Sequence, residues 1–290
     1  MATPFDDNPV EIVTGKTQQF QCKTDAGRPS SRIQWYMSGT NITSLATPQD
    51  VICSLNCNGK VISSSVLTYT GNRGDEGKIM YCTALNIENQ SVGSQNKTVE
   101  ILYGASSVII SPTLQIYTVK ETIEGVGPIN CTADDCNPDC AMTWSRPTMS
   151  DGYISVLNLQ KINRTQAGNY SCNASNTAWS KTSVAVNVIV QYGPAVVNIS
   201  PPNQTYTIKE LTGSAGHIIC NADCKPDCII TWKGNNVPVG TNNILYLTNI
   251  TRKQAGNYQC TATNNVGNNT SVTVIVIVLY YRNINFQYQD

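Results

Sequence analysis

The spacing of the cysteines constrains this chain more than any other feature. Its twelve cysteines fall into three groups of four, and each group contains a cysteine, a tryptophan 12 or 13 residues later, and a closing cysteine. This frame is typical of a β-sandwich with a buried tryptophan. We therefore expect an all-β chain of three tandem sandwiches. The frames are Cys22, Trp35, Cys82; Cys131, Trp144, Cys172; and Cys220, Trp232, Cys260.

The second and third frames lie in two copies of one longer sequence. Tyr117-Thr-Val-Lys-Glu returns as Tyr206-Thr-Ile-Lys-Glu, and Gln166-Ala-Gly-Asn-Tyr-Ser-Cys returns as Gln254-Ala-Gly-Asn-Tyr-Gln-Cys. A repeat of this length indicates duplication of a whole domain. Alternating small or apolar residues before the cysteines indicate strands, and helical periodicity is limited to one turn at 164–167 and its copy.

The predicted domain boundaries follow apolar final strands, at Tyr103-Gly104 and at Tyr192-Gly193-Pro194. The first module therefore covers 1–103, the second 104–193 and the third 194–281, with a tail or stalk at 282–290. The junctions are short and contain little flexible sequence, which favours a semi-rigid rod over loosely tethered domains.

Composition narrows the class of function. Only 13% of the residues are charged and the formal net charge is zero, so the chain lacks the basic surface that nucleic-acid binding needs. An even number of framed cysteines favours an oxidising, extracellular compartment. N-linked glycans are expected to supply the solubility that charge does not. Their acceptor asparagines are Asn41, Asn89, Asn96, Asn130, Asn163, Asn169, Asn173, Asn198, Asn203, Asn249, Asn268 and Asn269.

The ends of the chain give no membrane segment of their own. Residues 1–9 lack the apolar core of a signal peptide, and the apolar run 272–281 is too short to span a bilayer. We expect a protein of the cell surface or a secreted protein, attached to a membrane only through a segment absent from this chain.

Two tyrosines support the same β-sandwich prediction as the cysteine frames. Tyr170 and Tyr258 each lie two residues before a closing cysteine, the position of the tyrosine corner. With these corners and the Tyr-Gly junctions, the chain resembles the immunoglobulin superfamily over about residues 9–281. The resemblance implies three inter-sheet disulfides, Cys22–Cys82, Cys131–Cys172 and Cys220–Cys260.

The first module departs from the other two. Its frame cysteines are 60 residues apart, against 41 and 40, and Met80 occupies the tyrosine-corner position. The extra length predicts additional strands between Trp35 and 61–69. The first module is therefore expected to be variable-like or intermediate, and the other two to be shorter constant-like repeats.

Each module also has a second pair of cysteines with three residues between them. In the two repeats the pair encloses Pro-Asp, which favours a turn. A disulfide there would clamp the loop, and the alternative is a rigid knob that contacts a neighbour or a ligand. A metal site beside Asp134, Asp135 and Asp139 is disfavoured because oxidised cysteines cannot supply thiolates, so no metal or other cofactor is predicted. The three pairs are Cys53 with Cys57, Cys136 with Cys140, and Cys224 with Cys228.

Strand alternation suggests where a ligand would bind. If Trp35 and Cys82 point inward, Gln34, Tyr36, Tyr81 and Thr83 point outward from one sheet of the first module. Two tyrosines on an outer face suit a protein interface, although ordinary surface tyrosines are an equal alternative. In the second module Asn169, Ser171 and Asn173 point outward instead, and glycans there would make that module a spacer.

Enzyme chemistry has no support, because the chain has one histidine, His217, which alternation places toward solvent. The resemblance to carcinoembryonic-antigen-related adhesion molecules and comparable invertebrate proteins implies an ectodomain for cell adhesion or recognition. Its partner would be a protein, either another protein or a second copy of the chain, bound mainly by the first module. The alternatives are an innate-immune recognition receptor and the ectodomain of a receptor enzyme.

Overall fold

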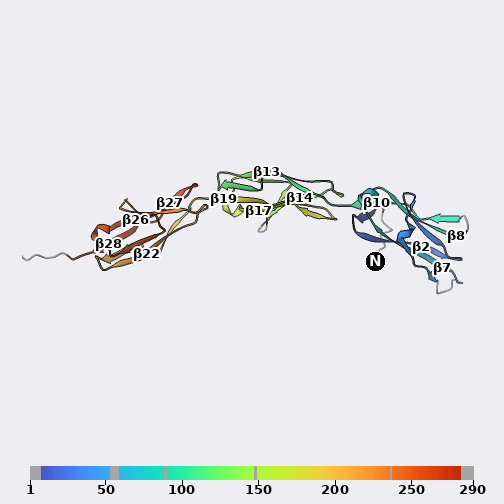
Figure 1. Cartoon of the computed structure of the whole chain (residues 1–290), viewed down its shortest axis with the longest axis horizontal. Coiled ribbons are helices and arrows are strands. Elements are labelled where there is room, and N and C mark those ends of the chain that lie inside the picture. The colour runs from blue at the N-terminus through green and yellow to red at the C-terminus, as the bar shows by residue number, and fades with distance from the viewer. Residues whose placement is uncertain (1–7, 53–58, 88–89, 147–148, 236, 282–290) are drawn as a thin grey trace, which may run out of the picture.

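The computed structural model contains three β-sandwiches that lie end to end in a gently curved row (Figure 1). It describes residues 8–52, 59–87, 90–146, 149–235 and 237–281. The sequon Asn89 and the tail 282–290 lie outside the described residues, and the exact domain boundaries stay predictions. No helix in the described part of the chain is long and apolar enough to cross a membrane.

The first sandwich has one sheet of order β1-β10-β8-β3-β4, with β9 beside β8, and a second of order β2-β7-β5, with β6 beside β7. Its strands are β1 (Val10–Val13), β2 (Thr17–Gly27), β3 (Arg32–Met37), β4 (Thr40–Asn41), β5 (Ala46–Pro48), β6 (Val51–Ile52), β7 (Val61–Thr70), β8 (Ile79–Ile87), β9 (Gln90–Gly93) and β10 (Lys97–Leu102), and its 3₁₀ turns are η1 (Thr43–Leu45) and η2 (Arg73–Asp75). The short strands β4, β5 and β6 account for the extra length between β3 and β7, as the cysteine spacing predicts.

The second sandwich pairs β11-β13-β16 in one sheet and β12-β19-β17-β14-β15 in the other, with β18 beside β17. Its elements are β11 (Val108–Ser111), β12 (Ile116–Lys120), β13 (Val126–Ala133), β14 (Ala141–Arg146), β15 (Met149–Ile154), β16 (Val156–Leu159), η3 (Arg164–Gln166), β17 (Gly168–Ser175), β18 (Ser180–Thr182) and β19 (Val186–Gln191).

The third sandwich repeats this order, with β20-β22-β25 in one sheet, β21-β28-β26-β23-β24 in the other, and β27 beside β26. Its elements are β20 (Val197–Ser200), β21 (Thr205–Lys209), β22 (Ser214–Ala222), β23 (Ile229–Gly234), β24 (Val237–Gly240), β25 (Ile244–Thr248), η4 (Arg252–Gln254), β26 (Gly256–Thr263), β27 (Asn268–Thr270) and β28 (Val274–Leu279). Both repeats are short, as predicted for constant-like domains. However, β15 and β24 pair with the strand that carries the tryptophan. A constant-type sandwich has no strand at that position and instead has a fourth strand in the opposite sheet.

Each core is built around a tryptophan that lies against a disulfide. Trp35, Trp144 and Trp232 are buried, and each is the direct cross-strand partner of a frame cysteine, in the pairs Trp35↔Cys82, Trp144↔Cys172 and Trp232↔Cys260. Cross-strand partners point to the same face of a sheet, so the indole and the disulfide share the core. The structure contains the bonds Cys22–Cys82, Cys131–Cys172 and Cys220–Cys260.

Short disulfides clamp one turn in each of the two repeats. Cys136 is bonded to Cys140, and Cys224 is bonded to Cys228. Each bond closes the turn that leads into the tryptophan strand, β14 or β23. Cys53 and Cys57, the corresponding pair of the first module, lie outside the described residues, so a bond between Cys53 and Cys57 stays a prediction.

Tyrosine corners close the two repeats, and a different contact closes the first module. Tyr170 donates to the carbonyl oxygen of Gln166, and Tyr258 to that of Gln254, each at 2.8 Å. In the first module Met80 is buried at this position, and Tyr69 instead donates to Asp75 Oδ2 at 2.8 Å.

Asp75 lies in η2 and is itself buried. Burial tends to raise the pKa of Asp75, but hydrogen bonds from Lys78, Tyr69 and the Asn72 amide outweigh it, so the pKa is lowered overall. Burial, together with the hydrogen bond to Asp75, raises the pKa of Tyr69 to about 12. The Tyr69–Asp75 hydrogen bond ties the end of β7 to η2, whereas the corner tyrosines of the repeats tie η3 and η4 to the strands that follow them.

Candidate functional site

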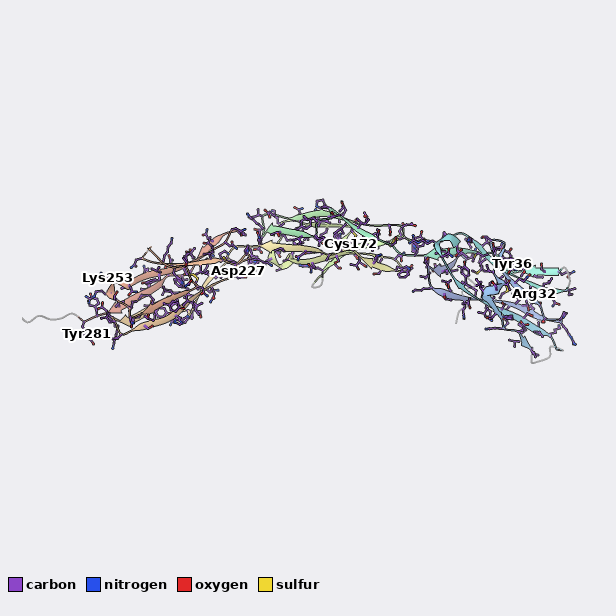
Figure 2. All side chains as sticks on the ribbon, in the orientation of Figure 1. Arg32, Tyr36, Cys172, Asp227, Lys253 and Tyr281 are labelled. Atoms are coloured by element: carbon purple, nitrogen blue, oxygen red, sulfur yellow. A yellow bond between two sulfur atoms is a disulfide. The ribbon has the colours of Figure 1, made fainter. Side chains whose placement is uncertain are left out.

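The four side chains predicted to form a binding face lie together on β3 and β8 of the first module. The strands are antiparallel, with Gln34 opposite Thr83 and Tyr36 opposite Tyr81. Because Trp35 and Cys82 are buried between them, these four point to the outer side of the sheet, where each is half-buried. Figure 2 labels Tyr36 on this sandwich, at one end of the row. We call Gln34, Tyr36, Tyr81 and Thr83 the first-module face.

The two tyrosines of this face are stacked on each other. Their ring centroids are 5.2 Å apart with an interplanar angle of 12°, and Tyr36 donates a hydrogen bond to Gln34 Oε1 at 3.3 Å. Cross-strand aromatic pairs contribute about 0.2–1 kcal/mol to a sheet. Rings that are already ordered lose little conformational entropy on binding, so the stack is suited to contact another protein.

Neighbouring residues extend the face in two directions. Leu85 pairs with Arg32 in the next outward position and is 37% exposed. On the other side Tyr36 pairs directly with Asn41 of β4, an exposed sequon asparagine. The sequence did not reveal that Asn41 lies at this edge, because the pairing of the two-residue strand β4 has no sequence signal.

The corresponding faces of the other two modules are different. In the second module Thr143 is opposite Asn173 and Ser145 is opposite Ser171. In the third module, Thr231 is opposite Thr261 and Lys233 is opposite Gln259. These residues are polar and form no aromatic stack in the part of the chain that the structure describes.

Most of the predicted glycan acceptors are accessible. Of the eleven sequon asparagines within the described residues, nine are exposed and two, Asn173 and Asn269, are half-buried. Asn173 accepts hydrogen bonds from Ser180 at 3.1 Å and Thr182 at 3.3 Å. Asn169 is exposed on the same strand. Which sequons carry glycans stays a prediction.

A second aromatic pair lies on the smaller sheet of the third module. His217 is exposed, as alternation predicts, and it packs edge-on against Tyr246 with ring centroids 4.7 Å apart. Tyr246 is 57% exposed and lies between the buried Leu245 and Leu247. Alternation of these leucines could have indicated an outward tyrosine, but the partner strand had to be known to pair it with His217.

The aspartates beside the short disulfide of the second module bind different partners. Asp134 accepts hydrogen bonds from Ser106 and Ser107, and hydrogen bonds from these two residues, that of the Ser106 hydroxyl above all, lower the pKa of Asp134 to about 2. Among the described residues no group of three histidine, cysteine or acidic side chains is placed to hold a metal ion.

Asp135 belongs to the contact between the first and second modules. Arg73 lies over the ring of Tyr103, 4.0 Å from its centroid, and the Tyr103 hydroxyl donates to Asp135 at 3.0 Å. Arg73 is also 3.7 Å from the Asp135 carboxylate. The hydrogen bond to Asp135 raises the pKa of Tyr103.

The junction between the second and third modules repeats this arrangement. Arg164 lies 3.8 Å from the ring centroid of Tyr192, whose hydroxyl donates to Asp223 at 3.0 Å. Arg164 pairs with Asp223 at 3.2 Å and, within its own module, with Glu121 at 2.8 Å. We call each set of arginine, tyrosine and aspartate a junction latch. The sequence showed the tyrosines at the boundaries but not their partners.

Backbone hydrogen bonds support both latches. The backbones of Tyr103 and Asn137 pair as an antiparallel bridge, with N···O distances of 2.8 and 3.0 Å, and those of Tyr192 and Lys225 do the same at 2.7 and 3.0 Å. Asn137 lies between Cys136 and Cys140 in the sequence, and Lys225 has the same place in the third module. The clamped turn therefore contacts the preceding module, which agrees with the interpretation of the turn as a rigid knob.

An asparagine completes each junction. Asn176 donates to the carbonyl oxygens of both Tyr103 and Pro138 at 2.8 Å, and Asn264 does the same for Tyr192 and Pro226.

Glycine follows the latch tyrosine at both junctions because the next module packs closely there. A Cβ on Gly104 would collide with the side chain of Trp179, and a Cβ on Gly193 would lie 3.0 Å from Gly267 Cα. A larger residue would have to push the modules apart.

Comparison with known proteins supports the fold over nearly the whole chain. A model of the CD80-like C2-set immunoglobulin domain matches residues 6–91, where we expected a variable-like or intermediate domain, and an immunoglobulin domain model matches residues 196–278. In solved structures, the full three-domain ectodomain of mouse nectin-like molecule 4 superposes with a TM-score of 0.60 and 16% identity, over 94% of this chain and 98% of that one.

Curated relatives are larger proteins. The receptor-type tyrosine-protein phosphatase F of Danio rerio is 26% identical over 277 residues, which cover 88% of this chain and 14% of that protein. The limbic system-associated membrane protein of Rattus norvegicus is 34% identical over 129 residues, 43% of this chain and 36% of that protein. The chain thus spans only a minor part of the relatives it matches. Together with the three sandwiches, these matches identify the chain as an array of immunoglobulin-superfamily domains of the type found in multi-domain adhesion and receptor ectodomains.

Proposed function

We propose that this chain is an extracellular adhesion or recognition module that binds protein through the first-module face and has no catalytic activity of its own. The observation that carries the proposal is the stacked pair Tyr36–Tyr81, which lies half-buried on the outer side of the sheet that contains β3 and β8, in the module at one end of the row. The other two modules present polar residues at the corresponding positions. They act as spacers that hold the first module away from its attachment point.

The partner we propose is a second copy of the same chain. Two copies related by a two-fold axis would bring the same face into contact with itself, the commonest geometry of homodimers. The formal net charge is zero, so long-range repulsion between copies is weak. Tyrosines and the neighbouring Leu85 supply the apolar centre that such a contact needs.

Sedimentation equilibrium over a concentration series tests this proposal. The parent chain should form dimers, and the double variant Tyr36→Ser/Tyr81→Ser should shift the dimer dissociation constant upward by at least about tenfold, because tyrosines at interface centres often contribute more than 1 kcal/mol each. Tyr246→Ser is the matched control, since it removes an exposed strand tyrosine from another module and should leave dimerisation unchanged.

Cell aggregation supplies the second readout. Cells that display the parent chain should aggregate, and cells that display the double variant should not. Equal aggregation by both, with a parent chain that stays monomeric in the centrifuge, would refute homophilic binding by this face.

One alternative has an observation in its favour. The match to a receptor-type phosphatase covers most of this chain, so the array would also suit the ectodomain of a receptor enzyme whose catalytic domain lies elsewhere in the protein. The sequence of the full-length gene tests this alternative directly. The likeness to carcinoembryonic-antigen-related molecules, an invertebrate origin and the innate-immune alternative stay predictions.

A further inference from the structure

The far end of the third module has an arginine and a tyrosine arranged like those of the two junction latches. Arg252 lies 4.3 Å from the ring centroid of Tyr280. Its Nε and Nη2 atoms bind Glu210 at 3.0 and 2.9 Å, as those of Arg164 bind Glu121 at 3.0 and 2.8 Å. In the second junction the remaining Nη1 of Arg164 meets Asp223. No carboxylate within the described residues occupies that position at Arg252 and Tyr280.

Exposed apolar side chains lie beside Tyr280. Leu211, Leu279 and Tyr281 are 65%, 51% and 93% exposed. With Tyr280 they line a surface depression of about 570 Å³, and Figure 2 labels Tyr281 at this end of the row. An exposed apolar surface beside a cation that can bind a carboxylate is what a protein partner with an acidic residue would cover.

The tip of the first module carries some of the residues that the second and third modules use to bind the module before them. Asn86 donates to the carbonyl oxygen of Pro29 at 2.8 Å, as Asn176 and Asn264 donate to Pro138 and Pro226. In the two internal junctions the same amide group also donates to the latch tyrosine of the preceding module.

An exposed aspartate and a groove complete this tip. Asp25 is the third residue after Cys22, as Asp223 is the third after Cys220. The tip is hollowed by a groove of about 570 Å³ whose lining includes Asp25, Asn86 and the exposed Val92.

We propose that the third module of one copy docks onto the tip of the first module of a second copy, so that Asp25 meets Arg252 and Tyr280 as Asp223 meets Arg164 and Tyr192. The charges are complementary, and the contact continues the arrangement that joins the modules within the chain. Because this contact is heterologous, it generates open chains of copies rather than closed dimers.

Tyr281 makes the docking weaker than an internal junction. It stands where the internal junctions have Gly104 and Gly193, which are in close contact with the next module. The docked modules must therefore sit further apart on this side. Tyr281→Gly restores the internal pattern and should tighten the association.

Sedimentation velocity of the full chain at about 10 μM to 1 mM, which covers weak dissociation constants from micromolar to millimolar, tests the proposal. Asp25→Lys blocks the tip and Tyr280→Ser blocks the far end, and both residues are exposed, so folding should be preserved. All measurements are made in the Tyr36→Ser/Tyr81→Ser background, which removes contacts through the first-module face and keeps the two proposals distinguishable.

In that background the unblocked chain should form oligomers that grow with concentration, and Tyr281→Gly should shift this growth to several-fold lower concentration. Each blocked variant alone should be monomeric. An equimolar mixture of the two should form two-copy species and nothing larger, because each variant keeps one intact end. Monomers throughout, oligomers that persist in either blocked variant, or a mixture that stays monomeric would each overturn head-to-tail docking.

Discussion

Removal of one aspartate should loosen the second junction without disturbing the folding of either module. Asp223 is bonded to Tyr192 and Arg164 across the junction, and its side chain is 74% exposed, so Asp223→Ala leaves no cavity. Asp227→Ala is the matched control. It removes the same charge from the adjacent clamped turn, where Asp227 is exposed.

The size of the effect follows from the two interactions that Asp223 makes across the junction. An exposed ion pair contributes about 0.2–1 kcal/mol, and a hydrogen bond contributes about 0.5–1.5 kcal/mol net. Since both partners of Asp223 are near solvent, we take about 1 kcal/mol for the two together. Removing them would raise the ratio of open to closed junctions by about fivefold. The backbone bridge between Tyr192 and Lys225 remains, so the junction stays mostly closed.

Amide hydrogen exchange measures this opening directly. The backbone amides of Tyr192 and Lys225 donate across the junction, so they exchange only when the modules separate or the module unfolds. Their exchange rates should rise about fivefold in Asp223→Ala and not in Asp227→Ala, whereas amides inside β22 should be unaffected. Equal rates in the two variants, or amides without protection in the parent chain, would refute the latch.

Three further predictions concern the first module and its junction. Asp75→Asn should destabilise the first module by about 1–3 kcal/mol at neutral pH. The folded-state pKa of Asp75 is lowered below 3.8, so the stabilisation that the Asp75 carboxylate gives the folded module is present above pH 3.8 and is lost as the pH falls further. The calorimetric transitions of the parent chain and the variant should therefore converge in acid. Gly104→Ala should open the first junction, because its Cβ meets Trp179, and the amides of Tyr103 and Asn137 should then exchange faster while module melting is unchanged. If Asn41 carries a glycan beside Tyr36, Asn41→Gln should strengthen self-association in sedimentation equilibrium, whereas the remote control Asn203→Gln should not; a weaker dimer in Asn41→Gln would count against the first-module face.

Local sequence patterns were enough to predict the sandwiches and the outward row of the first-module face. The fixed distance from cysteine to tryptophan and the two-residue period of a strand decide which side chains share a core. Tyr36 and Tyr81 could therefore be placed from Trp35 and Cys82 alone.

Contacts between segments far apart in the chain could not be predicted in this way. Nothing near Tyr103 in the sequence points to Arg73 or Asp135, because their meeting depends on how one sandwich docks on the next. The pairing of Asn41 with Tyr36 depends on a two-residue strand. Met80 showed that the usual corner is missing, but its replacement by Tyr69 and Asp75 required the folded module.

Hydrogen–deuterium exchange of the full chain, compared between dilute and self-associated samples of the Tyr280→Ser variant, tests the proposed function most directly. This variant lacks the head-to-tail contact, so any protection reports binding elsewhere. The proposed function predicts slower exchange in segments 32–37 and 79–87 of the first module, with the corresponding strands β14, β17, β23 and β26 unchanged. Protection confined to the second or third module, or no change at any concentration at which the chain associates, would contradict it.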